Sequence, residues 1–225
     1  MRVITWNLFH GRAVPERRHD LYDEFLAAIA GWEWDVLMLQ EAPPWWPERF
    51  AAALRLTGRA VRTSRNFGLP IRRAIATRRP DLIKANGGGS NAILVRNQAI
   101  VAHRYRRIRW LPERRLVHGV RLASGVWICN LHMQGSRSHL VAPSPVAETA
   151  AAGAAAREWA GEQTPLVLGG DWNVARPEPP GFELVPGHRG VDQLLVRNLG
   201  FHGVARALDR GELSDHRPVC AKIVV

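Results

Sequence analysis

The chain has 225 residues, of which 46% are hydrophobic and 23% are charged, as is ordinary for a globular protein in water. No apolar run is long enough to span a membrane, and the N-terminus has no apolar segment of the signal-peptide type. Cys129 and Cys220 both lie inside apolar runs, which favours reduced thiols and argues against a disulfide scaffold. These features predict a single domain over residues 1–225 and a cytoplasmic location.

The net charge of +11 is concentrated in one part of the chain. Between Arg55 and Arg121 there are 17 Lys and Arg residues against two acidic residues. Such a region favours a polyanionic partner and attracts it electrostatically. Compositional bias toward arginine is the alternative, but it explains the choice of arginine over lysine better than the uneven placement. Nucleic acid, or another phosphodiester, is therefore the expected partner, and no protein partner is implied.

The first third of the chain predicts two strands and two helices in alternation. In the first helix Leu21, Phe25 and Ile29 share one face at a spacing of four residues. Pro43-Pro44 ends the second strand. In chain order these elements are a strand at 3–7, a helix at 15–30, a strand at 35–41 and a helix at 46–56.

The rest of the chain predicts mainly short strands, with one strong helix. That helix has Ser144 as its N-cap and Pro145 at its first position, and it extends to Trp159. A Pro/Gly-rich loop at 176–190 follows the strand at 165–170. The predicted strands are 92–95, 100–110, 115–122, 126–132, 165–170, 191–197 and 217–225.

Helices scattered irregularly among many antiparallel-looking strands predict an α+β protein with two packed sheets and flanking helices. A doubly wound parallel sheet requires a more regular alternation. The chain contains neither a G-x-G-x-x-G motif nor a P-loop motif.

An acid and an amide follow the apolar strand at 165–168, at Asp171 and Asn173. Their side chains project the same way if the backbone stays extended, and Gly169-Gly170 permits a close approach of the backbone. This pair suits a phosphate and metal site, but it also suits an Asx-turn that closes a strand. The pair alone leaves both interpretations open.

Polar residues recur at the downstream ends of the other apolar runs. They are almost entirely Asn, Asp, Glu and His, which are ligands of hard metals, proton carriers and hydrogen-bonding partners of phosphate. Strand ends that meet at one edge of a sandwich would bring these side chains together. They are Asn7, Glu41, Asn91, Asn130, His132, Asp171, Asn173, Asp192, Asp215 and His216.

In this order, the motifs around these residues resemble the endonuclease/exonuclease/phosphatase superfamily. The resemblance implies a DNase I-like fold, a four-layered α/β/β/α sandwich of two mostly antiparallel sheets, and divalent-metal-dependent cleavage of phosphate esters. It implies Mg²⁺ as the cofactor, with Mn²⁺ as a possible substitute. The motifs are Thr5-Trp-Asn7, Leu39-Gln-Glu41, Gly89-Ser-Asn91-Ala, Asn130-Leu-His132, Gly170-Asp171-Trp-Asn173, Val191-Asp192 and Ser214-Asp215-His216-Arg-Pro-Val.

The resemblance also implies roles for the metal ligands and the proton carriers. Glu41 resembles the principal Mg²⁺ ligand, with Asn7 and Asp215 completing the shell directly or through water. His216 resembles the residue that activates the attacking water, and Asp192 would orient it. Asp171 is the alternative base, so the division of this task stays open.

The remaining positions resemble groups that contact the phosphate. Asn173 would bind a nonbridging oxygen, and His132 is a candidate general acid or phosphate donor. Asn130 could support the same loop and, with Asn91, is a candidate for binding substrate, although Asn91 could equally cap a Gly-rich turn. His10 and the six other histidines outside the motifs are expected to be surface or core residues.

Three functions follow from these expectations. The first is a Mg²⁺-dependent phosphodiester hydrolase, a nuclease for DNA or RNA that uses in-line attack of water. The second is a phosphatase or phosphodiesterase for a small phosphorylated metabolite or a lipid headgroup. The third is a catalytically silent module that binds nucleic acid, against which the intact set of polar residues argues.

Overall fold

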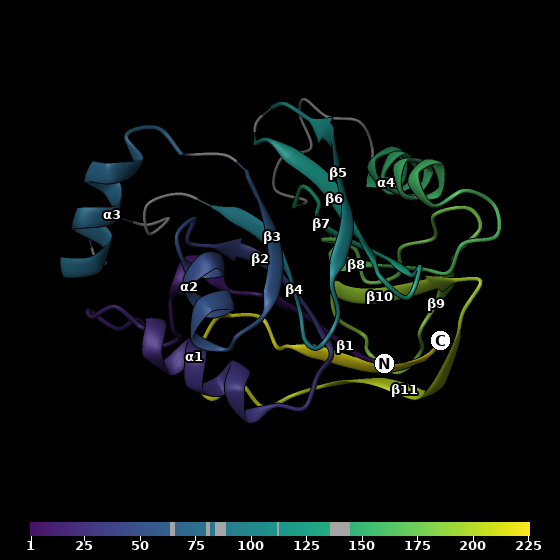
Figure 1. The fold of residues 1–225 in the computed structure, drawn as a ribbon. Helices are drawn as coiled ribbons and strands as arrows, with labels where there is room; N and C mark the ends of the chain where they lie inside the picture. The colour runs from purple at the N-terminus through teal and green to yellow at the C-terminus, as the bar shows by residue number, and fades with distance from the viewer. Residues whose placement is uncertain (64–65, 80–81, 84–88, 112, 136–144) are drawn as a thin grey trace.

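The computed structural model describes residues 1–63, 66–79, 82–83, 89–111, 113–135 and 145–225. Its strands form two six-stranded sheets that pack face to face, with helices on the outer sides (Figure 1). This is the four-layered α+β sandwich that the sequence predicts. None of the described helices is long and apolar enough to cross a membrane.

Helices α1 (Tyr22–Gly31) and α2 (Trp46–Ala53) cover the outer face of the first sheet. Their aromatic and aliphatic side chains pack against Trp6 and its neighbours, with Phe25 and Trp6 ring centroids 5.0 Å apart. Strands β1 and β2 are parallel and all other neighbours are antiparallel. The strand order is β11 (Gly200–Ala207), β12 (Val219–Val224), β1 (Arg2–Asn7), β2 (Val36–Ala42), β4 (Ser90–Val95) and β3 (Thr57–Arg62).

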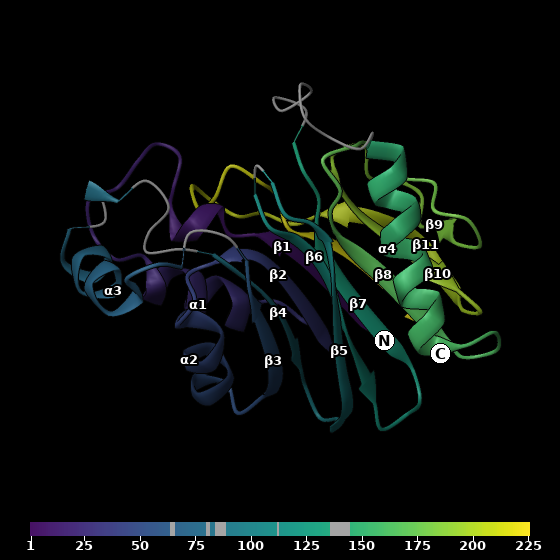
Figure 2. The same ribbon diagram turned by 90° about the horizontal axis from the view of Figure 1, so that it is seen from above.

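Helix α4 (Pro145–Ala160) covers the second sheet, as both ribbon views show (Figures 1 and 2). Its buried alanines pack on Leu131 and Leu168, and its expected N-cap, Ser144, lies outside the described residues. Strands β7 and β8 are parallel. The strand order is β5 (Ile100–Arg109), β6 (Arg115–Leu122), β7 (Trp127–His132), β8 (Leu166–Asp171), β10 (Asp192–Arg197) and β9 (Glu183–Leu184).

A chain of buried amides crosses the largely apolar core between the sheets and joins them. Gln40 of β2 donates from Nε2 to Thr5 Oγ1 at 3.0 Å and to Asn130 Oδ1 at 2.7 Å. Asn130 of β7 donates in turn to the carbonyls of Leu39 and Ala92, both at 2.9 Å. Because unpaired polar groups are costly in such a core, these bonds fix β7 against β2 and β4.

Several elements differ from the sequence prediction. Helix α1 begins at Tyr22 instead of residue 15, since residues 15–20 are polar and the Asp20 side chain accepts the Tyr22 N–H at 3.2 Å. Helix α3 (Leu69–Arg78), β3 and β11 were not predicted. They bury little apolar surface, and in α3 only Ala76 is buried, so their sequences lack a periodic apolar face.

Candidate active site

The strand order brings the polar residues at the strand ends to one edge of the sandwich. In the first sheet, parallel β1 and β2 carry Asn7 and Glu41 to this edge. In the second, His132 of β7 is in register with Asp171 of β8, which is in register with Asp192 of β10. Parallel β7 and β8 end at this edge and antiparallel β10 starts there, so three ionisable side chains lie in a row.

A glycine places Asp171 close to its neighbour on β7. Gly170 has φ +140°, and a Cβ built on it would lie 2.0 Å from the Leu131 carbonyl oxygen. Only glycine fits this approach without moving the backbone. The sequence expectation that Gly169-Gly170 permits a close backbone approach is therefore confirmed, and the approach is strand to strand.

Asp171 is buried and held by several donors. Its Oδ2 accepts from Asn7 Nδ2 at 2.9 Å, and its Oδ1 accepts the backbone N–H of Asn173 at 3.0 Å. His132 Nε2 lies 3.4 Å from Oδ2. Burial, followed by the negative charge of Asp192, raises the pKa of Asp171 to about 7 despite these donors. Asp171 therefore combines a fixed orientation with a pKa suited to accepting a proton near neutrality.

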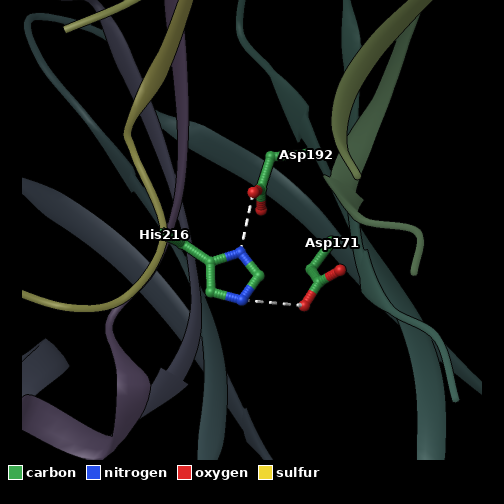
Figure 3. A group of neighbouring side chains, drawn as sticks. All are labelled: Asp171, Asp192 and His216. Carbon is green, nitrogen blue, oxygen red and sulfur yellow. Dashed lines mark hydrogen bonds and ion pairs between the residues drawn. The ribbon is translucent and has the colours of Figure 1, made fainter. Parts of the chain in front are cut away.

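His216 lies between two aspartates, as Figure 3 shows. Its Nδ1 is 2.7 Å from Asp192 Oδ2, and its Nε2 is 3.9 Å from Asp171 Oδ2. Burial disfavours the charged ring and lowers its pKa. The hydrogen bond and the charge of Asp192, together with the charges of Asp171 and Asp215, outweigh burial and raise the pKa of His216 to about 9. In the absence of a cation, His216 is therefore an imidazolium at neutral pH.

The loop that carries His216 is fastened to β1. Ser214 donates from Oγ to the Asn7 carbonyl at 2.7 Å and accepts the backbone N–H of His216 at 3.0 Å. Trp6, buried beneath, donates from Nε1 to the His216 carbonyl at 3.1 Å. These bonds place a residue of the first sheet against the aspartates of the second.

Glu41 leaves the strand ladder at an unusual backbone conformation. Its φ is +49°, next to a register shift between β2 and β4, and this conformation is uncommon for a side chain of this kind. Its carboxylate lies 3.0 Å from His10 Nε2 and 3.6 Å from His132 Nε2. Burial is the main cause of a raised Glu41 pKa, which the charge of Arg115 opposes.

His132 is held in one tautomer by Arg115. Nη1 of Arg115 lies 2.9 Å from Nδ1 of the ring, and a guanidinium can only donate, so Nδ1 accepts and Nε2 carries the proton. Burial and then the charge of Arg115 lower the pKa of His132 well below its ordinary value. Arg115 is itself held by Glu113 at 2.6 Å. The Nε2–H of a neutral His132 therefore points to the two carboxylates of Asp171 and Glu41.

The three asparagines outside β1 have different surroundings. Asn130 makes the sheet-joining bonds described above and is fully buried, so the expected substrate contact is corrected to a structural role. Asn91 is also buried, but neither its Nδ2 nor its Oδ1 has a partner among the described residues. Asn173 has φ +53° and donates from Nδ2 to the Met133 carbonyl at 2.9 Å.

Two groups of side chains have the chemistry to hold a cation. Glu41 and Asp215 interact through charge, and their carboxylate oxygens suit Mg²⁺ or Mn²⁺, whereas the Oδ1 of neighbouring Asn7 accepts the backbone N–H of Phe9 at 2.9 Å. Within the described chain, ligand atoms of Asp171, Asp192 and His216 also lie within 4.8 Å of one another. An ion in the second group would have to replace the short Asp192–His216 hydrogen bond, so the first group fits better.

A small cleft opens beside these residues, and a larger hollow lies elsewhere. The hollow, of about 510 Å³, is formed by residues of β11, β12 and the end of α1 and contains none of the predicted site residues. The candidate site is therefore identified by the chemistry of its side chains and not by the volume of the cavity. The small cleft is lined by His10, Glu41, Thr63, Glu113, Arg114, Arg115 and His132.

Two residues of this site were missed in the sequence. His10 was expected to be a surface or core residue, and the structure instead places it against Glu41, in the short η1 helix (Phe9–Gly11) with φ +55°. Arg115 was noticed only as part of the basic segment. Its position as the first residue of the strand at 115–122 was the one available signal, because its contact with His132 joins separate strands.

Comparisons with known proteins give one family match and several solved structures of similar fold. A model of the Endonuclease/Exonuclease/phosphatase family matches residues 4–216. No curated protein sequence matches the chain. Similar solved structures include the human Nocturnin catalytic domain with bound sulfate, with 16% identity, 99% of this chain and 92% of that chain covered, and a TM-score of 0.69.

Two further solved structures have the same fold. Truncated TDP2 from Caenorhabditis elegans has 16% identity and a TM-score of 0.67, and the match covers 100% of this chain and 97% of the TDP2 chain. The mannosyl-6-phosphatase of Bacteroides thetaiotaomicron has 15% identity, 100% coverage of both chains and a TM-score of 0.64. At such low identity these likenesses establish the DNase I-like fold alone.

Proposed function

Because this chain belongs to the endonuclease/exonuclease/phosphatase family, whose members are generally hydrolases of phosphoesters, we propose that it is a divalent-metal-dependent phosphodiesterase that acts on nucleic acid. One observation carries this proposal. His216 spans Asp192 and Asp171 at the edge where Glu41 emerges from the other sheet. Proton carriers and cation ligands thus lie at one edge of the sandwich, beside the small cleft that Glu41 and His132 line.

The cation would be held by Glu41, Asp215 and Asn7. When bound there, it would neutralise charge on a phosphate oxygen and act as a Lewis acid. The raised pKa of Glu41 supports this assignment, because a desolvated carboxylate gains stability from a nearby cation. Family members typically depend on a divalent metal, and hard oxygen ligands favour Mg²⁺ or Mn²⁺.

We assign to Asp171 the role of the general base that accepts the proton of the attacking water. Without a cation, the carboxylates around His216 raise its pKa to about 9, which favours the protonated ring as a donor, whereas Asp171 has a pKa of about 7 and a fixed carboxylate. As the water oxygen bonds to phosphorus, its proton passes to Asp171 and the bond to the leaving oxygen breaks. The leaving oxygen then takes a proton from solvent. His216, oriented by Asp192, donates from Nε2 to the developing negative charge.

Other donors would hold the phosphate. Neutral His132 presents a fixed Nε2–H, so its role in this scheme is a hydrogen-bond donor and not a general acid. The amide of buried Asn91, which has no hydrogen-bond partner among the described residues, is the candidate for a substrate oxygen, and Asn173 lies two residues beyond Asp171. Arg115 adds positive charge beside Glu41.

Nucleic acid is favoured by the charge of the chain. The segment between Arg55 and Arg121 holds 17 basic residues against two acidic ones, and Arg115 from this segment reaches the site. A polyanion gains from such a region through release of its counterions, whereas a single small phosphate gains little.

A substrate panel tests the proposal. Single-stranded and duplex DNA, RNA, bis-p-nitrophenyl phosphate and sugar phosphates are incubated with Mg²⁺, Mn²⁺ or EDTA at two salt concentrations. We expect cleavage of nucleic acid that requires metal, falls steeply with salt, and is abolished by His216→Ala and reduced by Asp171→Asn. If every phosphodiester survives with both metals, or if the two variants retain full activity, the proposal is wrong.

The second candidate is a phosphatase for a small phosphorylated metabolite. The limited size of the cleft beside Glu41 favours it, as does the likeness in fold to a mannosyl-6-phosphatase. This alternative predicts release of inorganic phosphate from sugar phosphates with little dependence on ionic strength. If the same panel shows phosphate release from sugar phosphates while nucleic acid stays intact, the protein is a phosphatase and the nuclease proposal is wrong.

A further inference from the structure

The two sheets each end in a basic edge strand at the same end of the sandwich. β3 is the edge of the first sheet and β5 the edge of the second, and the two strands lie side by side (Figure 2). The charge of Arg59 on β3 acts on His103 of β5, which agrees with this placement. A groove of about 310 Å³ lies here, lined by Val61, Arg62, Tyr105, Arg107, Arg114 and Leu116.

The alternation of β5 divides its side chains between this groove and α4. Arg106 forms two hydrogen bonds with Glu158 of α4, at 2.8 and 2.7 Å, so the even-numbered side chains point to the helix. Tyr105 and Arg107 therefore point to the opposite face, where they line the groove.

Large aromatic side chains are exposed beside the arginines. Tyr105 is 67% exposed and Trp110 is 64% exposed. The guanidinium of Arg107 lies 3.3 Å from the centroid of Trp110, and that of Arg114 lies 5.8 Å from it. Tyr105 lines the groove and Trp110 lies beside it against Arg107, so flat apolar faces and positive charges occur together here.

The groove continues into the cleft of the candidate active site. Arg114 lines both hollows, and Arg62 of the groove is followed directly by Thr63 of the cleft. A chain molecule lying in the groove would therefore reach Glu41 and His132 without crossing the body of the protein.

Charged residues on edge strands commonly prevent sheets from pairing with one another, and this explains arginines on β3 and β5. It does not explain exposed Tyr105 and Trp110, since aromatic surface promotes association. A ligand with both phosphates and accessible base faces satisfies both features. Bases in a duplex are already stacked, whereas bases in a single strand can stack on aromatic side chains.

We propose that this groove binds single-stranded nucleic acid, with bases stacked on Tyr105 and Trp110 and phosphates paired with Arg107, Arg114 and Arg62. The proposal rests on the proposed function and supplies its substrate class. Stacking and phosphate pairing do not read the 2′-hydroxyl, so DNA and RNA are both bound, and the neighbouring cleft would cut the strand that the groove holds.

Binding without catalysis tests the groove. Fluorescein-labelled oligo(dT) and oligo(U) of twelve nucleotides are titrated with the metal-free protein in EDTA, and anisotropy is measured at several salt concentrations. We expect Tyr105→Ala to weaken binding about tenfold through loss of stacking. Arg107→Ala should weaken it and reduce the slope of log K against log salt by about 0.7. Circular dichroism verifies that these exposed variants fold.

Arg104→Ala is the matched control, because it removes one exposed arginine from the same strand on the opposite face. It should change binding less than twofold. Equal losses with Arg104→Ala and Arg107→Ala, tighter binding of duplex than of single strand, or no binding at all would overturn the proposal.

Hydrolysis separates this proposal from the function on which it rests. Tyr105→Ala and Arg107→Ala should raise the KM for oligonucleotides more than they lower kcat, whereas Arg104→Ala should leave hydrolysis of both oligonucleotides and bis-p-nitrophenyl phosphate unchanged. If wild-type protein binds oligonucleotides through Tyr105 but hydrolyses no phosphodiester, the proposed function fails while the groove stands. If it hydrolyses bis-p-nitrophenyl phosphate and binds no oligonucleotide, the groove assignment fails alone.

Discussion

Asp192→Asn removes the charge that holds His216 protonated and keeps the shape of the side chain. The Asn oxygen can still accept from Nδ1, so the ring should keep its orientation. Without the negative charge of Asp192, the pKa of His216 should fall from about 9 toward its ordinary value of 6.5, with the charges of Asp171 and Asp215 still opposing the effect of burial. A fall over this whole range corresponds to roughly 3 kcal/mol, to be reduced for the 21% exposure of the His216 side chain.

The same change alters the pH dependence of stability in the metal-free protein. Because the pKa of His216 is raised on folding, its contribution is fully present below the unfolded pKa of 6.5 and is lost as pH rises through about 9. Asp171 also has a raised pKa of about 7, so the stability that its protonation contributes is lost as pH rises to about 7, before the range in which His216 titrates. Between pH 7 and 9.5 the wild type should therefore lose stability through His216, and Asp192→Asn should lose much less.

Two measurements check this reasoning. NMR titration of the His216 ring in EDTA gives its pKa directly, and urea unfolding at pH 7 and 9.5 gives the two free energies of unfolding. Asp209→Asn, a change of charge on a residue of the loop between β11 and β12, is the control and should alter neither quantity. A His216 pKa that is unchanged in Asp192→Asn would refute the assignment of Asp192 as the source of the shift.

Two further predictions concern the amide chain and the cation. Asn130→Ala should lower the free energy of urea unfolding by about 2–4 kcal/mol, because it removes one buried hydrogen bond each from the Leu39 carbonyl, the Ala92 carbonyl and the Gln40 amide; a loss under 0.5 kcal/mol would contradict the structural role. Glu41→Gln should raise the melting temperature in EDTA, because burial raises the pKa of Glu41 and the metal-free fold is destabilised at pH values above that pKa. The variant should also abolish stabilisation by Mg²⁺, and calorimetry that shows equal Mg²⁺ stabilisation in variant and wild type would exclude Glu41 as a ligand.

The sequence predicted the central strands and the helices that pack on them, but not the edge elements. Leu21, Phe25 and Ile29 are all buried, as their spacing predicts. β3 and β11 stayed hidden because an edge strand exposes most of its side chains and so carries no clear alternation. The start of α1 was misplaced because residues 15–20 can form a helix but have nothing to pack against.

For the candidate site, the sequence predicted which residues lie at the strand ends better than it predicted which side chains contact them. Strand ends could be located, so Asp171 and Asp192 were expected at the edge where they lie in register. Contacts between separate strands leave no periodic signal, and for this reason His10 beside Glu41 and Arg115 beside His132 were missed. Asn130 shows a second limit of sequence-based prediction, since an amide at a strand end can bind a phosphate or hydrogen-bond to a neighbouring sheet equally well.

The buried amide chain from Thr5 to Asn130 has a consequence for how the activity should respond to mutation. Glu41 and the loop of His216 belong to the first sheet, whereas His132, Asp171 and Asp192 belong to the second, so the Glu41–His132 contact and both contacts of His216 cross the boundary between the sheets. A substitution deep in the shared core that slides one sheet by a fraction of an ångström would misalign the two halves while leaving the protein folded. Activity should therefore be more sensitive than stability to repacking between the sheets, including at positions remote from the cleft.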